Sequence, residues 1–433
     1  MLYSDLRLPH RRERSARSDF AAFWLGETVS LFGSQVTTLA LPLTAALTLG
    51  ANAAQMGLLS AAQTSPAVLF GLFIGVWVDR VRRRPVLIAA NLARALLIGS
   101  IPVAALLGVL GMPQLYAVAF LSGTSTIFFV VAYPAFLPSL LSADHLIEAN
   151  SKLHGSSAVA QIAGPGLGGL LVQLLSAPFA LAIDALSFLV SIGCMLQIRA
   201  PEASPPSASL DVRGEVAAGM RQVWHEPLLR PATLATAVGA LFSTMGGAVY
   251  VLYATRELGI GPAALGGIVA AGGPTALLGA ILSGRIVGRF GAGPALVASR
   301  LLSGGMALLV PLAGGPALLA VGLLALSRAG DGLAGAVNDV ILHTLTQTIP
   351  PPTVQGRVNA TVRVVAYGAM AAGALMGGFL GQVIGLRPAL AIAAAGLVGV
   401  ALWLRASPLA ALRALPASNS SSSLSSGDPT PGA

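Results

Sequence analysis

The chain has 433 residues, of which 55% are hydrophobic and only 9% are charged, and its formal net charge is +9. A soluble globular protein carries about 25% charged residues because its surface faces water. This composition therefore excludes a soluble enzyme or a free binding module, and it excludes disorder for most of the chain because disordered chains are polar. Since a spanning helix takes about 20 residues, we expect an all-α polytopic membrane protein of roughly twelve spans.

Twelve apolar runs separated by polar breaks are the predicted spans. In chain order they cover residues 20–49, 56–78, 86–110, 114–141, 153–175, 178–198, 231–254, 262–287, 294–313, 316–342, 358–384 and 388–404. They predict an N-terminal tail (1–19), a six-helix bundle (20–198), a central linker (199–230), a second six-helix bundle (231–404) and a disordered Ser-rich tail (405–433). Within the linker, apolar residues at helical spacing beside charged residues indicate an amphipathic helix on the membrane surface.

The basic residues are distributed unevenly between the two sides of these spans. Nineteen of the 25 Lys and Arg residues fall in tails and loops on one side, and only Arg256 and Arg387 fall in loops on the other. The positive-inside rule assigns the richer side to the cytoplasm. We therefore expect a multi-pass protein of the cell membrane with both termini and the linker in the cytoplasm. The arginines form no patch, so nucleic acid is not an expected partner.

The cysteine and histidine counts argue against several kinds of site. Cys194 is the only cysteine, and the five histidines never fall at the spacing of metal ligands. A disulfide framework is excluded, and neither a metal nor a cofactor is expected.

The two predicted bundles resemble each other at a shift of 209 residues. This shift takes Gly164 to Gly373, and the Leu-Gly-Gly that starts at Leu167 to the Met-Gly-Gly that starts at Met376. Two halves with the same orientation imply a parallel duplication about an axis along the membrane normal.

The loop after the second span carries a candidate gating motif of the pattern G-x-x-x-D-R-x-x-R-R. Its residues are Gly75, Asp79, Arg80, Arg83 and Arg84. The glycine allows close helix approach, and Asp79 can pair with a basic group or a helix N-terminus of the other half as a latch. The alternative is that the arginines only anchor the loop at the membrane surface. Gly288 stands at the shifted position of Asp79, so the latch is asymmetric.

The fifth span contains a Gly-Pro motif. Its residues are Gly164, Pro165, Gly168 and Gly169. With Gly166 they also spell G-x-G-x-x-G, but dinucleotide binding requires a preceding strand, and these glycines lie inside an apolar run. Small residues allow close helix packing and proline supplies a bend. We expect this span to pack closely against a partner in the other half; general tight packing is the alternative.

These two motifs resemble those of the major facilitator superfamily, and the Gly-Pro motif resembles that of its antiporter-type members. The opening of the first span (23–35), the Asp-Ala-Leu-Ser-Phe of residues 184–188 and the Gly-Arg-Val-Asn-Ala of residues 356–360 look like macrolide- and siderophore-type exporters of that superfamily. The resemblance covers almost the whole chain. It implies 12 transmembrane helices in two pseudo-symmetric six-helix halves, and export of amphipathic or hydrophobic small molecules driven by the proton motive force.

Charged residues inside the spans need a reason, because burying a charge in hydrocarbon is costly. The candidates for proton or substrate contacts are Glu27, Asp184, Arg94, Arg328, Asp331 and Arg363. Asp331 follows Arg328 by one helical turn, so these two side chains either act in transport or pair and neutralise each other. Glu27 has no cation near it in sequence, which favours a role in binding a proton or a cationic substrate.

We therefore expect a secondary active transporter, not an enzyme, that exports a drug, an antibiotic or a siderophore-like metabolite. Proton antiport and rocker-switch alternating access are the expected mechanism. The expected partners are the lipid bilayer, the small-molecule substrate and protons, and the chain is expected to act as a monomer. An importer or uniporter of the same fold remains an alternative, because a fold does not set the direction of transport. A transport-inactive membrane sensor is the alternative from another class.

Overall fold

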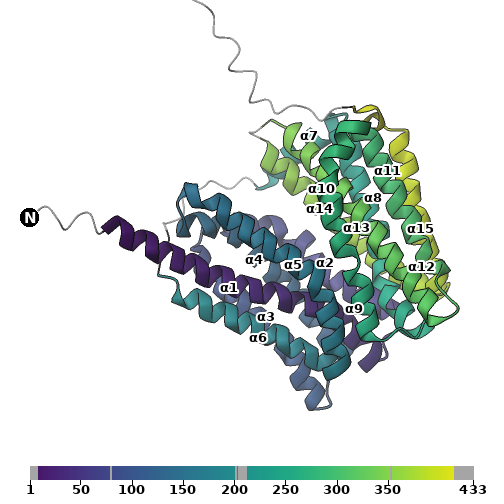
Figure 1. Ribbon diagram of the computed structural model, residues 1–433, viewed down its shortest axis with the longest axis horizontal. Coiled ribbons are helices and arrows are strands. Elements are labelled where there is room, and N and C mark those ends of the chain that lie inside the picture. The colour runs from purple at the N-terminus through teal and green to yellow at the C-terminus, as the bar shows by residue number, and fades with distance from the viewer. Residues whose placement is uncertain (1–7, 79, 200–201, 203–211, 352–353, 414–433) are drawn as a thin grey trace, which may run out of the picture.

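The computed structural model describes residues 8–78, 80–199, 202, 212–351 and 354–413, which form helices joined by short loops (Figure 1). The first half contains α1 (Leu8–Leu43), η2 (Thr44–Thr48), α2 (Ala53–Val78), α3 (Arg83–Leu106), α4 (Met112–Leu140), α5 (Ala143–Leu175) and α6 (Ala177–Gln197). The short helix α7 (Val212–His225) lies between the halves in sequence. The second half contains α8 (Leu229–Leu252), η3 (Tyr253–Glu257), α9 (Pro262–Ala270), α10 (Gly272–Phe290), α11 (Ala292–Ala307), α12 (Leu309–Leu312), α13 (Ala317–Thr348), α14 (Gln355–Val383), α15 (Leu386–Arg405) and η4 (Pro408–Ala411).

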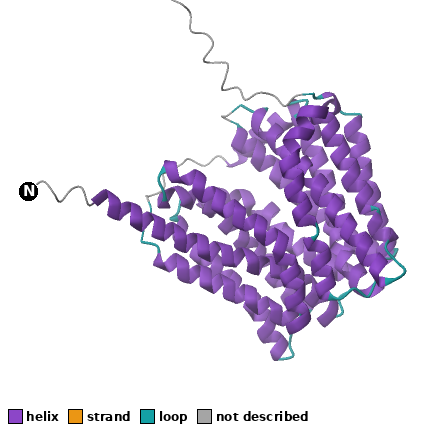
Figure 2. Ribbon diagram, in the orientation of Figure 1, coloured by secondary structure: helices purple, strands orange, loops and turns teal. Residues whose placement is uncertain are grey.

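These helices have the length and composition of membrane spans. Eleven helical segments of the described chain are long and apolar enough to cross a membrane, and α2 adds a twelfth with 26 residues and no charged side chain. Large apolar side chains cover the outer surface: Leu174 and Leu318 are 70% and 85% exposed. Figure 2 shows only helices and loops in the described ranges. The prediction of an all-α polytopic membrane protein is confirmed.

The two halves repeat each other in backbone detail as well as in sequence. The first span ends in the π-helical turn η2, and the corresponding span of the second half ends in the π-helical turn η3, at the same shift of 209 residues. Gly50 and Gly259, also related by this shift, both have φ of 63°. That left-handed conformation is readily available to glycine. The duplication inferred from the sequence therefore extends to the turns that end corresponding spans.

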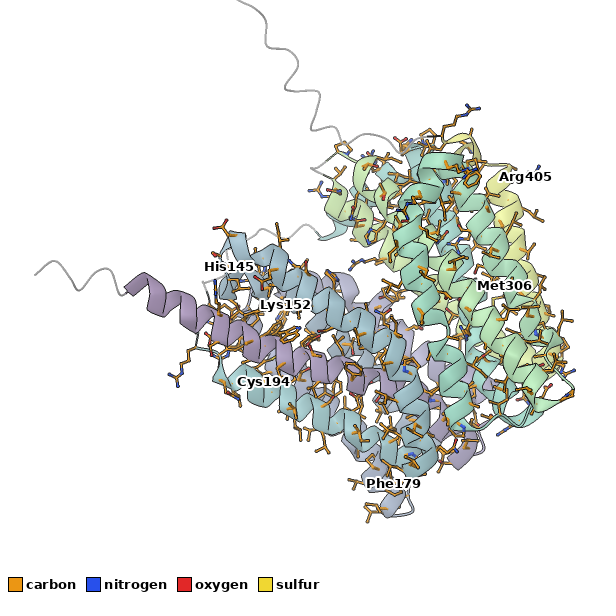
Figure 3. All side chains as sticks on the ribbon, in the orientation of Figure 1. His145, Lys152, Phe179, Cys194, Met306 and Arg405 are labelled. Atoms are coloured by element: carbon orange, nitrogen blue, oxygen red, sulfur yellow. The ribbon has the colours of Figure 1, made fainter. Side chains whose placement is uncertain are left out.

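The halves meet on one side of the molecule and separate on the other. We call the side where α1 begins and α15 ends the terminal side, and the side that carries η2 and η3 the far side. Figure 3 labels His145 and Arg405 toward the terminal side and Phe179 at the far side. In Figure 1 the first half (purple to teal) and the second half (green to yellow) lie close together toward the far side and diverge toward the terminal side.

The hydrophobic core has the same division. One large buried cluster draws on both halves and includes Leu43 and Met56 of the first half and Tyr253 and Leu265 of the second, and a small cluster of three alanines also joins the halves. Two further clusters belong to single halves: one packs around Phe136 between helices of the first half, and the other includes helices of the second half only. Apolar burial therefore joins the halves at the far side, where the shared cluster lies.

Several observed elements differ from the predicted ones: α5 begins at Ala143 rather than at residue 153, and the predicted span 294–313 is divided at Leu308 into α11 and α12. α1 begins at Leu8, well inside the predicted N-terminal tail. The predicted span 262–287 is split at Ala271 into α9 and α10. Pro274, in the first turn of α10, has no backbone N–H, so it cannot donate the i→i−4 hydrogen bond that a continuous helix would make there.

A further difference is a correction to the predicted disordered tail. Pro408–Ala411 form η4, with Leu409 buried, and the N–H of Gly293 donates to the carbonyl of Leu412 at 2.7 Å. The burial of Leu409 and this hydrogen bond to Gly293 hold the start of the tail against α11. The remainder of that tail, and residues 200–201 and 203–211 of the linker, lie outside the described residues, whereas α7 forms where the sequence predicted a helix in the linker.

Candidate functional site

The Gly-Pro motif of α5 packs against two different helices. A methyl group on Gly168 would lie 3.2 Å from the backbone of Val36, and one on Gly164 would overlap the side chain of Gln35, so both glycines face α1 of the same half. Gly169 and Pro165 instead face α9 of the second half, as does Gly166 between them. The predicted close packing is present, but half of it lies inside the first half rather than between the halves. The motif lies wholly inside α5, and no strand precedes it among the described residues, so the dinucleotide interpretation is excluded.

A pair of glycine contacts joins the halves near the far side. A methyl group on Gly169 would lie 2.8 Å from the Cα atom of Gly266, and one on Gly57 would lie 2.6 Å from the Cα atom of Gly378. Helices approach this closely only where both residues lack a side chain. We call these two pairs the far-side contact. The shift of 209 residues takes Gly57 to Gly266 and Gly169 to Gly378, so the duplicated motif builds both contacts.

The candidate gating motif is only partly described. Asp79 lies outside the described residues, so its predicted latch is not placed. Arg80 is exposed, and nothing in the described chain lies within 4 Å of the position of a methyl group on Gly75. Arg84 donates from Nε to the carbonyl of Met195 at 3.2 Å, which binds the start of α3 to the end of α6. Part of the arginine cluster therefore holds the first half together.

A carboxylate of the linker completes this region. Glu202 accepts hydrogen bonds from the backbone N–H groups of Arg83, through Oε1, and of Arg84, through Oε2 at 3.2 Å. A carboxylate at a helix N-terminus binds free N–H groups and is stabilised by the helix dipole. Glu202 was not identified from the sequence, because it lies more than a hundred residues from the helix that it caps.

A buried polar cluster occupies the interior of the first half. Arg94 of α3 is 7% exposed, and its guanidinium lies between two aromatic rings, 4.5 Å from the centroid of Phe129 and 4.4 Å from that of Phe188. It also donates to Asn91, whose amide donates to Ser191 at 3.0 Å. Stacking on aromatic faces makes a buried guanidinium tolerable.

Two carboxylates from other helices share this cation. Arg94 is close enough to Glu27 of α1 and Asp184 of α6 for its charge to interact with both. Asp184 is fully buried, and its carboxylate accepts hydrogen bonds from Thr37 Oγ1 at 2.5 Å and from Ser187 Oγ at 3.1 Å. Glu27 has one buried carboxylate oxygen, Oε2, without a hydrogen-bond partner among the described residues. The sequence places no cation near Glu27 along the chain, but in the folded protein α3 supplies Arg94.

The charged side chains of α13 do not form the ion pair that their spacing allowed. Asp331 accepts a hydrogen bond from Ser303 Oγ of α11 at 2.5 Å, and the guanidinium of Arg328 lies over the ring of Tyr250, 4.5 Å from its centroid. No ion pair within 4.0 Å joins them in the described part of the chain. Arg300 of α11 is close enough to Asp331 and Asp339 to interact with both charges.

Two cavities lie between the halves. One, of about 280 Å³, is lined by Gln35 and Gln63 of the first half and by Tyr250 and Arg328 of the second. The other, of about 310 Å³, lies between α2, α4 and the start of α14, nearer the terminal side, and the exposed Arg363 lines it. The sequence analysis identified both arginines. It did not identify Tyr250, because nothing in its apolar sequence context distinguishes it from a tyrosine that only packs in the core.

Comparison with known proteins places this geometry among transporters. Residues 15–429 match a family model described as transmembrane secretion effector. The multidrug efflux pump Tap of Mycolicibacterium fortuitum is 26% identical over 348 residues, which are 78% of this chain and 83% of that pump. The enterobactin exporter EntS of Escherichia coli is 27% identical over 359 residues, which are 81% of this chain and 83% of that exporter.

Solved structures agree on the fold. The nucleoside transporter NupG superposes with a TM-score of 0.74 at 12% identity and covers 90% of this chain and 98% of its own. A bacterial homologue of the iron transporter ferroportin gives 0.66 at 16% identity, covering 89% and 97%. Identities this low are evidence for the fold alone. The predicted arrangement of 12 spans in two pseudo-symmetric six-helix halves is confirmed.

Proposed function

Because the chain belongs to the transmembrane secretion effector family of the major facilitator superfamily, we propose that it exports a small amphipathic molecule from the cytoplasm in exchange for protons. This family and the relatives Tap and EntS are membrane transporters rather than enzymes. The observation that carries the proposal is the one-sided contact between the halves, which are joined at the far side and separate toward the terminal side. A protein of this shape can load a substrate from the terminal side and release it after the far-side contact opens.

Export requires the terminal side to face the cytoplasm, as the excess of basic residues on that side indicates. Reporter fusions at Gly111 and Gly314, in two far-side loops, should read as extracellular. A fusion at Ser207 in the linker should read as cytoplasmic. A cytoplasmic signal at Gly111 would contradict this orientation and, with it, loading from the cytoplasm.

The coupling site that we propose is the cluster around Arg94. One guanidinium can compensate only one carboxylate, so with Glu27 and Asp184 both ionised one negative charge is left in a low-dielectric interior. Binding one proton removes that charge. Asp184 is held by two hydroxyl donors, whereas Glu27 Oε2 has no such donor among the described residues. Glu27 is therefore the carboxylate that exchanges the proton.

In the proposed cycle, proton and substrate alternate on the two sides of the membrane. When the far side is open, Glu27 takes a proton from outside as the substrate leaves. When the terminal side is open, as in this structure, Glu27 releases the proton to the cytoplasm and the substrate binds in the cavity between the halves. Each ligand shifts the conformational equilibrium only as far as its affinities for the two states differ.

Dye accumulation in cells that lack their own exporters tests the direction of transport. Cells that produce the protein should retain less of an amphipathic dye, either carboxyfluorescein (an anion) or ethidium (a cation), than cells that carry an empty vector. A protonophore should abolish the difference. Increased retention of a dye would instead support the importer alternative.

A further inference from the structure

The cavity of about 280 Å³ between the halves has one charged residue on its wall. Its lining combines apolar side chains, such as Met56 and Leu59, with the polar side chains Gln35, Ser60 and Gln63 from α1 and α2. From the second half it receives Tyr250 and Arg328. Among its described lining residues there is no carboxylate, so the wall carries a formal charge of about +1 when Arg328 is protonated.

Arg328 has no anionic partner in the described protein. Its guanidinium stacks on the ring of Tyr250, but no hydrogen bond to it and no carboxylate within 4.0 Å are found among the described residues. Asp331, one turn further along α13, is engaged by Ser303 instead. A half-buried guanidinium whose donors are unused leaves a strong interaction available to a ligand.

Tyr250 supplies a second unused group at the same place. Its side chain is 5% exposed, and its buried hydroxyl has no hydrogen-bond partner in the described chain. A buried hydroxyl is normally paired, and an unpaired one lowers stability. Tyr250 and Arg328 line this cavity together, and both also line a cavity of about 180 Å³ inside the second half, whose wall includes Asp331.

We propose that the exported substrate is an amphipathic organic anion whose carboxylate, or comparable acidic group, binds Arg328 and the Tyr250 hydroxyl. This inference rests on the proposed function, since it assigns a chemical class to that substrate. The planar guanidinium matches the two oxygens of a carboxylate. Met56 and Leu59 accommodate the apolar body, and the amides of Gln35 and Gln63 offer hydrogen bonds from the other half. A cation in the cavity of about 280 Å³ would lie beside Arg328 with no carboxylate on the described wall, since Asp331 lines only the neighbouring cavity and accepts a hydrogen bond from Ser303.

Binding of three dansyl probes that differ in charge tests the inference. The full-length protein in nanodiscs of neutral phosphatidylcholine is titrated with dansylglycine (an anion), dansylamide (neutral) and dansylcadaverine (a cation), and dansyl fluorescence is followed. Dansylglycine should bind roughly tenfold more tightly than the other two probes, the range expected for a charge-assisted hydrogen-bonded contact. Arg328→Gln should remove this preference, whereas Arg405→Gln, which changes an exposed arginine at the end of α15 outside both cavities, should leave it unchanged.

Tyr250→Phe is the second variant, because it keeps the ring under Arg328 and removes only the hydroxyl. It should weaken dansylglycine binding severalfold and leave dansylamide binding unchanged. Tighter binding of dansylcadaverine by the wild-type protein, or an anion preference that survives in Arg328→Gln, would overturn the inference. Neither result depends on the direction of transport. If the protein preferred dansylcadaverine but exported ethidium, this inference would be wrong and the proposed function would stand. If it bound the anion selectively but exported neither dye, the proposed function alone would be contradicted.

Discussion

A Glu27→Gln protein should be produced at normal levels, yet it should fail to concentrate its substrate against a gradient. Glutamine keeps the shape of the side chain and stays uncharged in both conformations, as a permanently protonated carboxyl would. A pH difference of one unit supports about a tenfold concentration ratio for each proton exchanged. In proteoliposomes with an imposed pH gradient, the wild-type protein should approach such a ratio. The variant should stay near a ratio of about one, while one-for-one exchange of labelled substrate continues.

Two further variants make this result specific. Glu148→Gln removes an exposed carboxylate of α5 whose ion pair with Lys152, at 2.8 Å, lies on the surface, so it should behave as wild type. If Glu27→Gln still concentrated substrate with the pH dependence of wild type, Glu27 would not be the coupling carboxylate. Asp184 would then be the next candidate, since it interacts with the same cation.

Locking the far side should stop transport completely and reversibly. A methyl group on Gly381 of α14 would lie 3.1 Å from the Cβ atom of Ala53 of α2, so a shift of a few tenths of an ångström brings the pair to the Cβ separation of a disulfide, about 3.5 Å or more. In a Cys194→Ala background, the Ala53→Cys/Gly381→Cys protein should cross-link on oxidation. Because the halves could then no longer separate at the far side, its transport should fall to the level of protein-free liposomes. A reductant should restore transport.

A disulfide within one half provides the matched control. A methyl group on Gly99 of α3 would lie 3.4 Å from the Cβ atom of Ala185 of α6, in the same half. The Gly99→Cys/Ala185→Cys protein should also cross-link on oxidation, but it should keep transporting because each half moves as a unit. Unchanged transport by the oxidised Ala53→Cys/Gly381→Cys protein would show that the far-side contact does not open, and alternating access between these halves would be wrong.

The sequence predicted well those features that repeat or that follow from composition. Hydrophobic runs of spanning length predicted the helices, and matches at one fixed shift predicted a duplication that the structure repeats down to Gly50 and Gly259. The glycines of the Gly-Pro motif predicted close packing, since few other reasons place so many small residues on one apolar helix. Which helix each glycine touches depends on how the halves pack, and the sequence did not predict that Gly164 and Gly168 face α1.

Pairings between distant side chains could not be predicted. Glu27 lacks a cation in its own span, and Arg94 reaches it only because α1 and α3 both pack against α6. The spacing of Arg328 and Asp331 suggested a pair, but partners on α8 and α11 attract the two side chains in different directions. Local spacing shows which residues can meet, whereas packing between helices decides which of them do.

Proton movement during substrate transport tests the central proposal most directly. Proteoliposomes loaded with the pH indicator pyranine, with the membrane potential clamped by potassium and valinomycin, are given a transported dye on the outside only. Antiport predicts that the interior becomes alkaline as the dye enters, at a rate proportional to dye uptake. This signal should be absent from protein-free liposomes and from Glu27→Gln. If the wild-type protein carried dye into the liposomes while the internal pH stayed constant or fell, proton-coupled export would be contradicted.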